Sequence, residues 1–142
     1  MQINEIMTRK VDVIDPNTTI RDAARTMRAD NIGALPVGEN DRLIGMVTDR
    51  DIAMRGVAED KMGGNTTVRQ VMSERIYYCF EDEDVDQAAN AMAEHQVHRL
   101  PVLNRDKRLV GIVALADLAR SGTDAVKRAV QGISEPTDQP RR

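Results

Sequence analysis

Four consecutive side chains near residue 50 are the group in this chain best suited to chemistry. They are Thr48, Asp49, Arg50 and Asp51, and they follow an apolar, glycine-containing stretch that is expected to be a strand, at the start of an expected helix. The first turn of a helix has unpaired N–H donors and a partial positive charge, which together favour a phosphate. A threonine hydroxyl there can bind a phosphate or ribose oxygen, and an aspartate one turn later can accept both hydroxyls of a ribose. The segment therefore predicts contacts with sugar and phosphate groups, with Arg50 as a neighbouring cation.

A structural explanation of the same residues stays open. Threonine at the N-cap and an acidic residue three positions later form a reciprocal capping box, which needs no ligand. Thr48 and Asp51 have this spacing. For Arg50 the alternative is a solvated side chain, which is the more common role of an exposed helix arginine.

A second segment has the same layout and different chemistry. Ala114 takes the place of the threonine, whereas Asp117 keeps the ribose position. Asp117 also has a structural explanation, because an acidic residue in a first helical turn gains ~0.3–1 kcal/mol from the helix dipole. His98 and Arg99 precede the neighbouring apolar strand. Arginine suits bidentate contacts to phosphate, although a solvated arginine on a strand is the alternative.

Both segments belong to one internal repeat. The apolar pattern of residues 20–37 recurs over 85–102, at a spacing of 65 positions. Gly45 and Asp51 then recur 66 positions later, because the turn between the strands is one residue longer in the second copy. Turns accept insertions easily, so the two copies are expected to share one fold.

Each copy is expected to fold as strand, helix, two strands and helix, which makes the chain an α+β protein. Apolar positions at i, i+3, i+4 and i+7 predict the first helix of each copy. The expected strands cover 11–14, 34–37, 43–47, 76–80, 99–103 and 109–113, and the expected helices cover 20–30, 48–56, 85–94 and 114–120. The boundaries predicted from the repeat are 1–60 for the first copy, 61–67 for a linker, 68–122 for the second copy and 123–142 for a partly disordered extension.

Composition limits the classes of function. The formal net charge is −3 and the pI is about 5.4, which argues against nucleic acid as a partner. No apolar run approaches the ~20 residues that span a bilayer, and no signal segment is recognised, so we expect no membrane contact and a cytoplasmic location. Cys79 is the single cysteine, which excludes an internal disulfide. Its apolar and aromatic neighbours predict an ordinary thiol in a strand.

Metal binding and catalysis are not expected. His95 and His98 lie three positions apart with no carboxylate pair or cysteine cluster beside them in the sequence. The acidic run 81–84 is best explained as a solvated turn before a helix. No nucleophile, base and orienting group can be assembled, so an enzyme is the least favoured of three classes.

The strand pattern of 32–37, followed by a turn and the segment 43–52, resembles the cystathionine-beta-synthase (CBS) domain, and its recurrence resembles a tandem CBS pair, or Bateman module. The resemblance covers roughly residues 3–122 and is strongest to short, stand-alone members of the hypoxic-response type. It implies a β-α-β-β-α unit twice, related by a pseudo-two-fold axis. It also implies a homodimer in which two chains form a flat disc.

The resemblance further implies a regulatory module that binds an adenine nucleotide, AMP or ATP, or another adenosyl ligand in the cleft between the copies. Asp51 and Asp117 would bind ribose, Thr48 would bind phosphate or ribose, and His98 and Arg99 would bind phosphate. The adenine would lie against backbone near four positions, Val13, Ala34, Ile76 and Tyr78. No cofactor is required, and an effector protein would respond in trans. The alternative is a ligand-free stress-response module that acts through protein partners.

Overall fold

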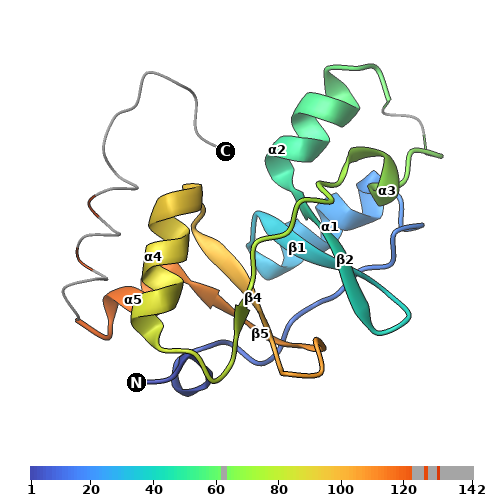
Figure 1. Cartoon of the computed structure of the whole chain (residues 1–142). Coiled ribbons are helices and arrows are strands. Elements are labelled where there is room, and N and C mark those ends of the chain that lie inside the picture. The colour runs from blue at the N-terminus through green and yellow to red at the C-terminus, as the bar shows by residue number, and fades with distance from the viewer. Residues whose placement is uncertain (62–63, 123–126, 128–130, 132–142) are drawn as a thin grey trace. The chain divides into compact units, whose positions relative to one another are not determined.

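The computed structural model describes residues 1–61, 64–122, 127 and 131, and its packing divides the chain into two compact units (Figure 1). The middle unit is Asp12–Ile76, and the outer unit combines Met1–Val11 with Tyr77–Arg142. Both units mix helices and strands, which confirms the α+β prediction. The extension predicted over 123–142 lies, apart from residues 127 and 131, outside the described residues.

The middle unit is built on a helix and an antiparallel hairpin. Thr19 caps the helix by accepting a hydrogen bond from the Asp22 N–H at 3.1 Å, and Asn31 ends it in the left-handed conformation, with φ 54°. The fully buried residues of the hairpin include Leu35, Val37 and Val47, which face the core. The elements are α1 (Ile20–Asp30), β1 (Ala34–Glu39), β2 (Arg42–Thr48), α2 (Asp49–Asp51), the π-helix η2 (Ile52–Val57) and α3 (Val68–Val71).

The outer unit repeats this plan with a three-stranded sheet of order β3-β4-β5. Its long helix begins with a cap: the Asp84 side chain accepts from the Asp86 N–H at 2.9 Å, and the Gln87 side chain accepts from the Asp84 N–H at 2.9 Å. The elements are η1 (Ile3–Glu5), β3 (Cys79–Phe80), α4 (Val85–His95), β4 (Arg99–Leu103), β5 (Leu109–Ala114) and α5 (Leu115–Ala119).

Each hairpin is flanked by a short arm, 3–8 in the outer unit and 68–73 in the middle unit. Thr8 exchanges two backbone hydrogen bonds with Ile112, at 2.8 and 2.9 Å, and Ser73 does the same with Met46, at 2.9 and 3.0 Å. The two arms are equivalent in the sequence repeat, yet each pairs with the hairpin of the other copy. The packing units therefore differ from the repeats 1–60 and 68–122. The predicted linker 61–67 includes residues 62–63, which lie outside the description.

Two predicted strands are shorter than expected, for the same reason. Only Ile14 of the segment 11–14 bridges Val37, and the second copy has β3 over Cys79–Phe80 alone. Extending either parallel ladder toward its N-terminus would need an N–H from Pro36 or Pro101, and proline has none. The ladders consequently end at Ile14 and at Cys79.

Two details of the predicted helices are also corrected. The helix predicted over 48–56 is a three-residue α2 followed by the π-helix η2, rather than one α-helix. Of the apolar positions i, i+3, i+4 and i+7 that predict α1, Ala24 is exposed, whereas Ile20, Ala23 and Met27 are buried.

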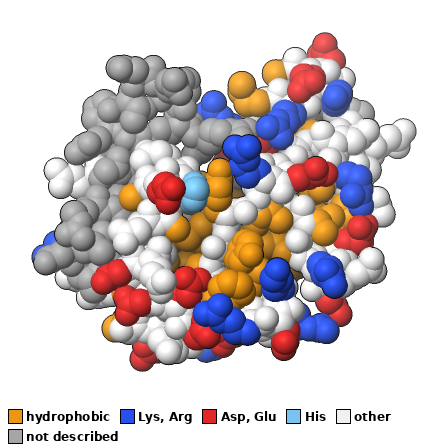
Figure 2. Space-filling view, viewed as in Figure 1, with side chains coloured by type: hydrophobic (Ala, Val, Ile, Leu, Met, Phe, Trp, Pro, Cys, Tyr) orange, Lys and Arg blue, Asp and Glu red, His pale blue; other side chains and the backbone are white. Residues whose placement is uncertain are grey.

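Acidic and basic side chains are interspersed on the face of the molecule that Figure 2 shows. Among the described residues, the exposed large apolar side chains are Met1, Val13, Met54, Val57 and Tyr78. Among the described residues, no helix has the length and apolar character needed to cross a membrane.

Candidate functional site

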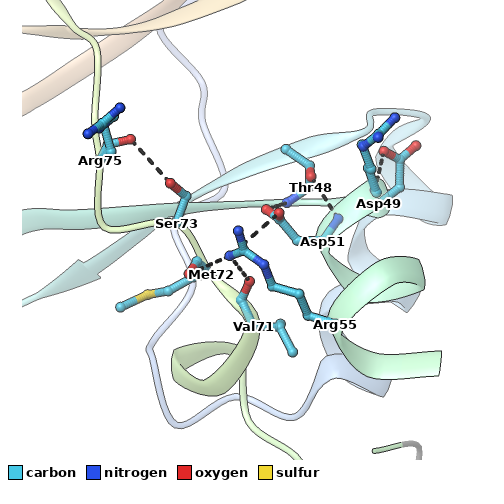
Figure 3. Close-up of polar contacts among 9 residues, drawn as sticks. Thr48, Asp49, Asp51, Arg55, Val71, Met72, Ser73 and Arg75 are labelled. Carbon is cyan, nitrogen blue, oxygen red and sulfur yellow. Dashed lines mark hydrogen bonds and ion pairs between the residues drawn. The ribbon is translucent and has the colours of Figure 1, made fainter. Parts of the chain in front are cut away.

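In the middle unit the start of α2 carries the reciprocal capping box that the sequence predicts. The Thr48 N–H donates to Asp51 Oδ2 at 3.0 Å, and the Asp51 N–H donates to Thr48 Oγ1 at 3.0 Å (Figure 3). Asp51 is only 4% exposed, and it lies in a unit whose core is otherwise apolar. Such burial is unusual for a carboxylate and requires hydrogen-bonding partners.

Two further contacts hold this helix start in place. The Asp49 N–H donates to the Gly33 carbonyl at 2.9 Å, and the Arg50 N–H donates to Asp49 Oδ1 at 2.8 Å. A Cβ at Gly33 would lie 3.0 Å from an Asp49 carboxylate oxygen, so the Asp49 side chain covers this glycine closely. The exposed carboxylate of Asp49 therefore lies at the junction of β2 and α2.

Arg55 is a residue of this site that the sequence analysis missed. Its Nη1 lies 3.9 Å from Asp51 Oδ1, and it donates to the carbonyls of Val71 at 3.1 Å and Met72 at 3.3 Å (Figure 3). Asp and Arg side chains at spacing i, i+4 commonly form an ion pair on a helix. The spacing of Asp51 and Arg55 in the sequence could therefore have indicated this pair.

In the outer unit the equivalent helix start has one of the two hydrogen bonds of the capping box. The Ala114 N–H donates to Asp117 Oδ2 at 2.9 Å, but Ala114 has no hydroxyl to return the bond. Arg120 forms a close ion pair with the other carboxylate oxygen of Asp117. Asp117 is 9% exposed, so both aspartates of the predicted ribose contacts are buried.

The strand register places one predicted site residue of each unit opposite a helix N-cap. Arg99 lies opposite Ala114, and Ala34 lies opposite Thr48. The carbonyl of His98 accepts the Leu115 N–H at 2.8 Å, which is the equivalent of the bond between Gly33 and Asp49. His98 and Arg99 are both exposed. The outer unit therefore has an imidazole and a guanidinium beside its helix start, where the middle unit has the small residues Gly33 and Ala34.

The predicted adenine contacts are divided between the units. Val13 and Tyr78 are 49% and 41% exposed, whereas Ala34 and Ile76 are partly buried. Val13, Ala34 and Ile76 belong to the middle unit and Tyr78 to the outer unit. The structure thus leaves two of these four side chains accessible to a ligand.

The histidines and aromatic rings near Tyr78 form local contacts. His95 stacks on Tyr77 with ring centroids 3.6 Å apart, and Tyr78 meets Phe80 edge to face at 5.6 Å. The guanidinium of Arg105 covers the Phe80 ring at 4.2 Å and pairs with Asp82. This pairing lowers the pKa of the Asp82 carboxyl from its ordinary value. Among the described residues, no three His, Cys, Asp or Glu side chains form a group that could hold a metal ion.

Comparison with known proteins identifies the family. The family model of the CBS domain matches the chain twice, over residues 3–57 and 68–124. The chain belongs to the CBS domain family. The double match confirms the tandem arrangement that the repeat predicts.

Similar proteins include short bacterial members of this family. The chain is 44% identical over 117 residues to the CBS domain-containing protein YhcV of Bacillus subtilis, which covers 82% of each chain. It is 40% identical over 134 residues to Hypoxic response protein 1 of Mycobacterium tuberculosis, which covers 93% of each. A crystal structure of Hypoxic Response Protein I with two coordinated zinc ions matches with a TM-score of 0.76 and covers 85% of this chain and 98% of that chain.

Two structural neighbours contain adenosyl ligands. The CBS domain pair of protein MJ0100, in complex with 5'-methylthioadenosine and S-adenosyl-L-methionine, is 28% identical with a TM-score of 0.76, covering 86% of this chain and 95% of that chain. The CBSX2 structure in complex with AMP is 26% identical with a TM-score of 0.75, covering 85% of this chain and 95% of that chain.

Proposed function

We propose that this chain is a regulatory module that binds an adenine nucleotide or a related adenosyl ligand and signals to a protein partner in trans. The observation that carries the proposal is the strand register, which aligns Arg99 with the helix start at Ala114 and Ala34 with Thr48. Support also comes from the family, since neighbours of this fold are complexes with AMP, 5'-methylthioadenosine and S-adenosyl-L-methionine.

Each residue has a distinct role in the proposal. Arg99 binds phosphate as an exposed cation, and the exposed imidazole of His98 donates a hydrogen bond to it. Asp51 and Asp117 accept ribose hydroxyls, since a carboxylate offers about four acceptor sites. Thr48 and Arg50 contribute at the helix start of the middle unit, and the adenine lies near Val13, Ala34, Ile76 and Tyr78.

The test is calorimetric titration with AMP and with adenosine. We expect Arg99→Ala to lower the affinity for AMP by roughly 10- to 100-fold, in line with the 1.5–3 kcal/mol of a hydrogen bond to a charged group. The affinity for adenosine should change little, because adenosine has no phosphate. Arg28→Ala, which removes an exposed arginine from the last turn of α1, is the matched control. If the affinities for AMP and adenosine fell equally, the assignment of Arg99 to phosphate would be wrong, and Arg99 would be an ordinary solvated side chain on a strand.

A second candidate is a ligand-free interaction module. It is favoured by the burial of Asp51, which is 4% exposed and already engaged in a complete capping box. Mass spectrometry of the protein under native conditions separates the two candidates. A co-purified adenosyl compound supports the nucleotide sensor, whereas protein that carries no ligand and gives no heat with AMP, ATP or S-adenosylmethionine supports the interaction module.

Homodimer formation and a cytoplasmic location are further parts of the proposal. Met54 and Val57 on η2 are 55% and 51% exposed, and apolar side chains of this size favour burial between chains. Light scattering is expected to give twice the chain mass of 15.8 kDa. Met54→Glu should shift the mass toward one chain, and a monomeric wild type at micromolar concentration would contradict the dimer.

A further inference from the structure

Arg55 connects two parts of the middle unit that the proposed function leaves separate. Figure 3 shows its guanidinium lying between the helix start at Asp51 and the end of α3. Nη1 is 3.9 Å from Asp51 Oδ1, 3.1 Å from the Val71 carbonyl oxygen and 3.3 Å from the Met72 carbonyl oxygen. One cation thus contacts both a buried carboxylate and a pair of main-chain acceptors 16 and 17 residues away.

The two carbonyls lie where α3 ends. Val71 is its last residue and Met72 is its C-cap, already extended with ψ 159°. Carbonyls at the end of a helix have no partner within the helix, and a cation there also interacts favourably with the helix dipole. Arg55 supplies both the donor and the charge. The next residue, Ser73, pairs with Met46, and residues 74–76 complete the middle unit.

Asp51 is placed to influence how Arg55 acts. The capping box fixes the carboxylate, so its charge has a defined position relative to the guanidinium. At 3.9 Å the interaction is a charge–charge attraction rather than a direct hydrogen bond. If Asp51 binds another donor or loses its charge, this attraction weakens. The hydrogen bonds from Arg55 to the Val71 and Met72 carbonyls then change in strength.

The outer unit has no such connection in its described residues. Arg120 pairs with Asp117, as Arg55 does with Asp51, but it contacts no carbonyl of the arm 3–8. The two repeats therefore differ in whether the aspartate at the helix start is linked to an arm. Arg120 provides an internal control for the pairing alone.

We propose that Arg55 is a positioning residue that couples the state of Asp51 to the attachment of residues 71–76. A ligand that engages Asp51 would thereby loosen or tighten the end of the middle unit. The ligand half of this inference rests on the proposed function, whereas the coupling between Asp51 and residues 71–76 exists without a ligand and can be measured without one.

The first experiment measures amide hydrogen exchange of the full chain without ligand, over the peptide that contains residues 71–76. We expect Arg55→Met to speed exchange there roughly tenfold, the factor for about one hydrogen bond lost to a charged donor. Asp51→Asn keeps an acceptor for the Thr48 N–H but removes the charge, and it should give a smaller increase. In the double variant the Asp51→Asn effect should disappear, because its route through Arg55 is gone. Arg120→Met should leave this peptide unchanged.

Additive effects of Asp51→Asn and Arg55→Met, or an equal response to Arg120→Met, would overturn the coupling. Arg55→Lys is the second variant if Arg55→Met does not fold. Lysine keeps the charge but not the planar fork of donors, so exchange should rise in Arg55→Lys, and wild-type exchange rates in that variant would also overturn the coupling.

The second experiment adds AMP to the wild type and to Arg55→Met. We expect AMP to change the exchange of residues 71–76 in the wild type and to leave it unchanged in Arg55→Met, although calorimetry still detects binding. An identical response in both proteins overturns the role of Arg55 in signalling. Absence of AMP binding to the wild type overturns the proposed function for AMP, while the ligand-free exchange data still decide the coupling.

Discussion

At the residue scale, one hydroxyl distinguishes the two helix starts. Thr48 Oγ1 accepts the Asp51 N–H at 3.0 Å, and Ala114 leaves the Asp117 N–H without that acceptor. We expect Thr48→Ala to lower the free energy of unfolding by about 1 kcal/mol, the usual loss for an N-cap hydroxyl. Ala114→Thr should stabilise the chain by up to about the same amount. Urea denaturation of both variants checks the pair, and a Thr48→Ala variant as stable as the wild type would contradict the capping role.

Cys79 provides a second prediction at this scale. The thiol is 4% exposed, and burial, with a smaller contribution from the charge of Glu83, raises its pKa to about 12. Because the folded pKa exceeds the unfolded value of about 9, the group contributes stability below pH 9 that is lost as the pH rises toward 12. The thiol should therefore resist iodoacetamide at pH 8 in the native chain and react rapidly in urea.

Cys79→Ala is the control for this second prediction. It removes the fall in stability that the thiol causes between pH 9 and 12. Rapid alkylation of the native wild type at pH 8 would show that Cys79 is accessible, and the burial of this thiol would then be contradicted.

At the element scale, two glycines allow the arms to approach the hairpins. A Cβ at Gly45 would lie 2.8 Å from the Ser73 carbonyl oxygen and 2.9 Å from Met72 Sδ. The equivalent distances at Gly111 are 2.7 Å to the Thr8 carbonyl oxygen and 2.8 Å to Met7 Sδ. These contacts are closer than van der Waals distance and involve main chain, so the arms would have to move.

We expect Gly45→Ala and Gly111→Ala each to destabilise the chain by about 1–3 kcal/mol, the usual cost of overpacking. Gly64→Ala is the control, because the nearest atom to its Cβ would be Arg21 Nη1 at 4.0 Å. Thermal unfolding of the three variants measures the difference. If Gly45→Ala and Gly111→Ala had the same melting temperature as Gly64→Ala, the close packing of the arms against the hairpins would be contradicted.

The sequence predicts most of the elements, because their causes are local. The helices predicted over 20–30 and 85–94 are found as α1 and α4, and β4 covers the predicted residues 99–103. The short ladders at Ile14 and Cys79 were not predicted, since the missing donors belong to Pro36 and Pro101 on a neighbouring strand. The sequence does not show which strand each parallel segment pairs with. The missing proline N–H could therefore not be used to predict where the ladder ends.

The candidate site divides in the same way. The capping box at Thr48 and Asp51 follows from spacing alone, and the alignment of Arg99 with Ala114 follows once the hairpin register is known. The contacts of Arg55 with Val71 and Met72 depend on the π-helical course of η2 and on where α3 packs. Neither can be predicted from the local pattern, which indicates only the i, i+4 pair of Asp51 and Arg55.

At the scale of the whole molecule, the packing units cross the boundaries of the repeats. The middle unit takes its arm from residues 68–73, which the sequence assigns to the second copy, and the outer unit takes its arm from residues 3–8. Val68 and Val71 of the middle arm are fully buried. A fragment cut at the repeat boundary therefore loses part of its core, and a fragment cut at the packing boundary keeps it.

Two fragments of similar length test this difference. We expect residues 12–76 to unfold cooperatively in urea, because they hold β1, β2, α1 and the arm with its bonds to Met46. Residues 1–60 should show no cooperative transition, since the face of Gly45 and the apolar contacts of Val68 and Val71 would be open to water. Chains of about 60 residues are only marginally stable, so both fragments are compared at low temperature.

A third fragment controls for the mere addition of residues. Residues 12–76 with Val68→Asp and Val71→Asp have the length of the packing unit without its apolar arm, and we expect them to behave as residues 1–60 do. The measurement is the slope of unfolding with urea, which scales with the surface exposed. If residues 1–60 unfolded as cooperatively as residues 12–76, the first repeat would be a folding unit by itself, and the arm 68–73 would be an addition to a finished domain. The structure predicts the reverse, because two fully buried side chains of that core, Val68 and Val71, come from the arm.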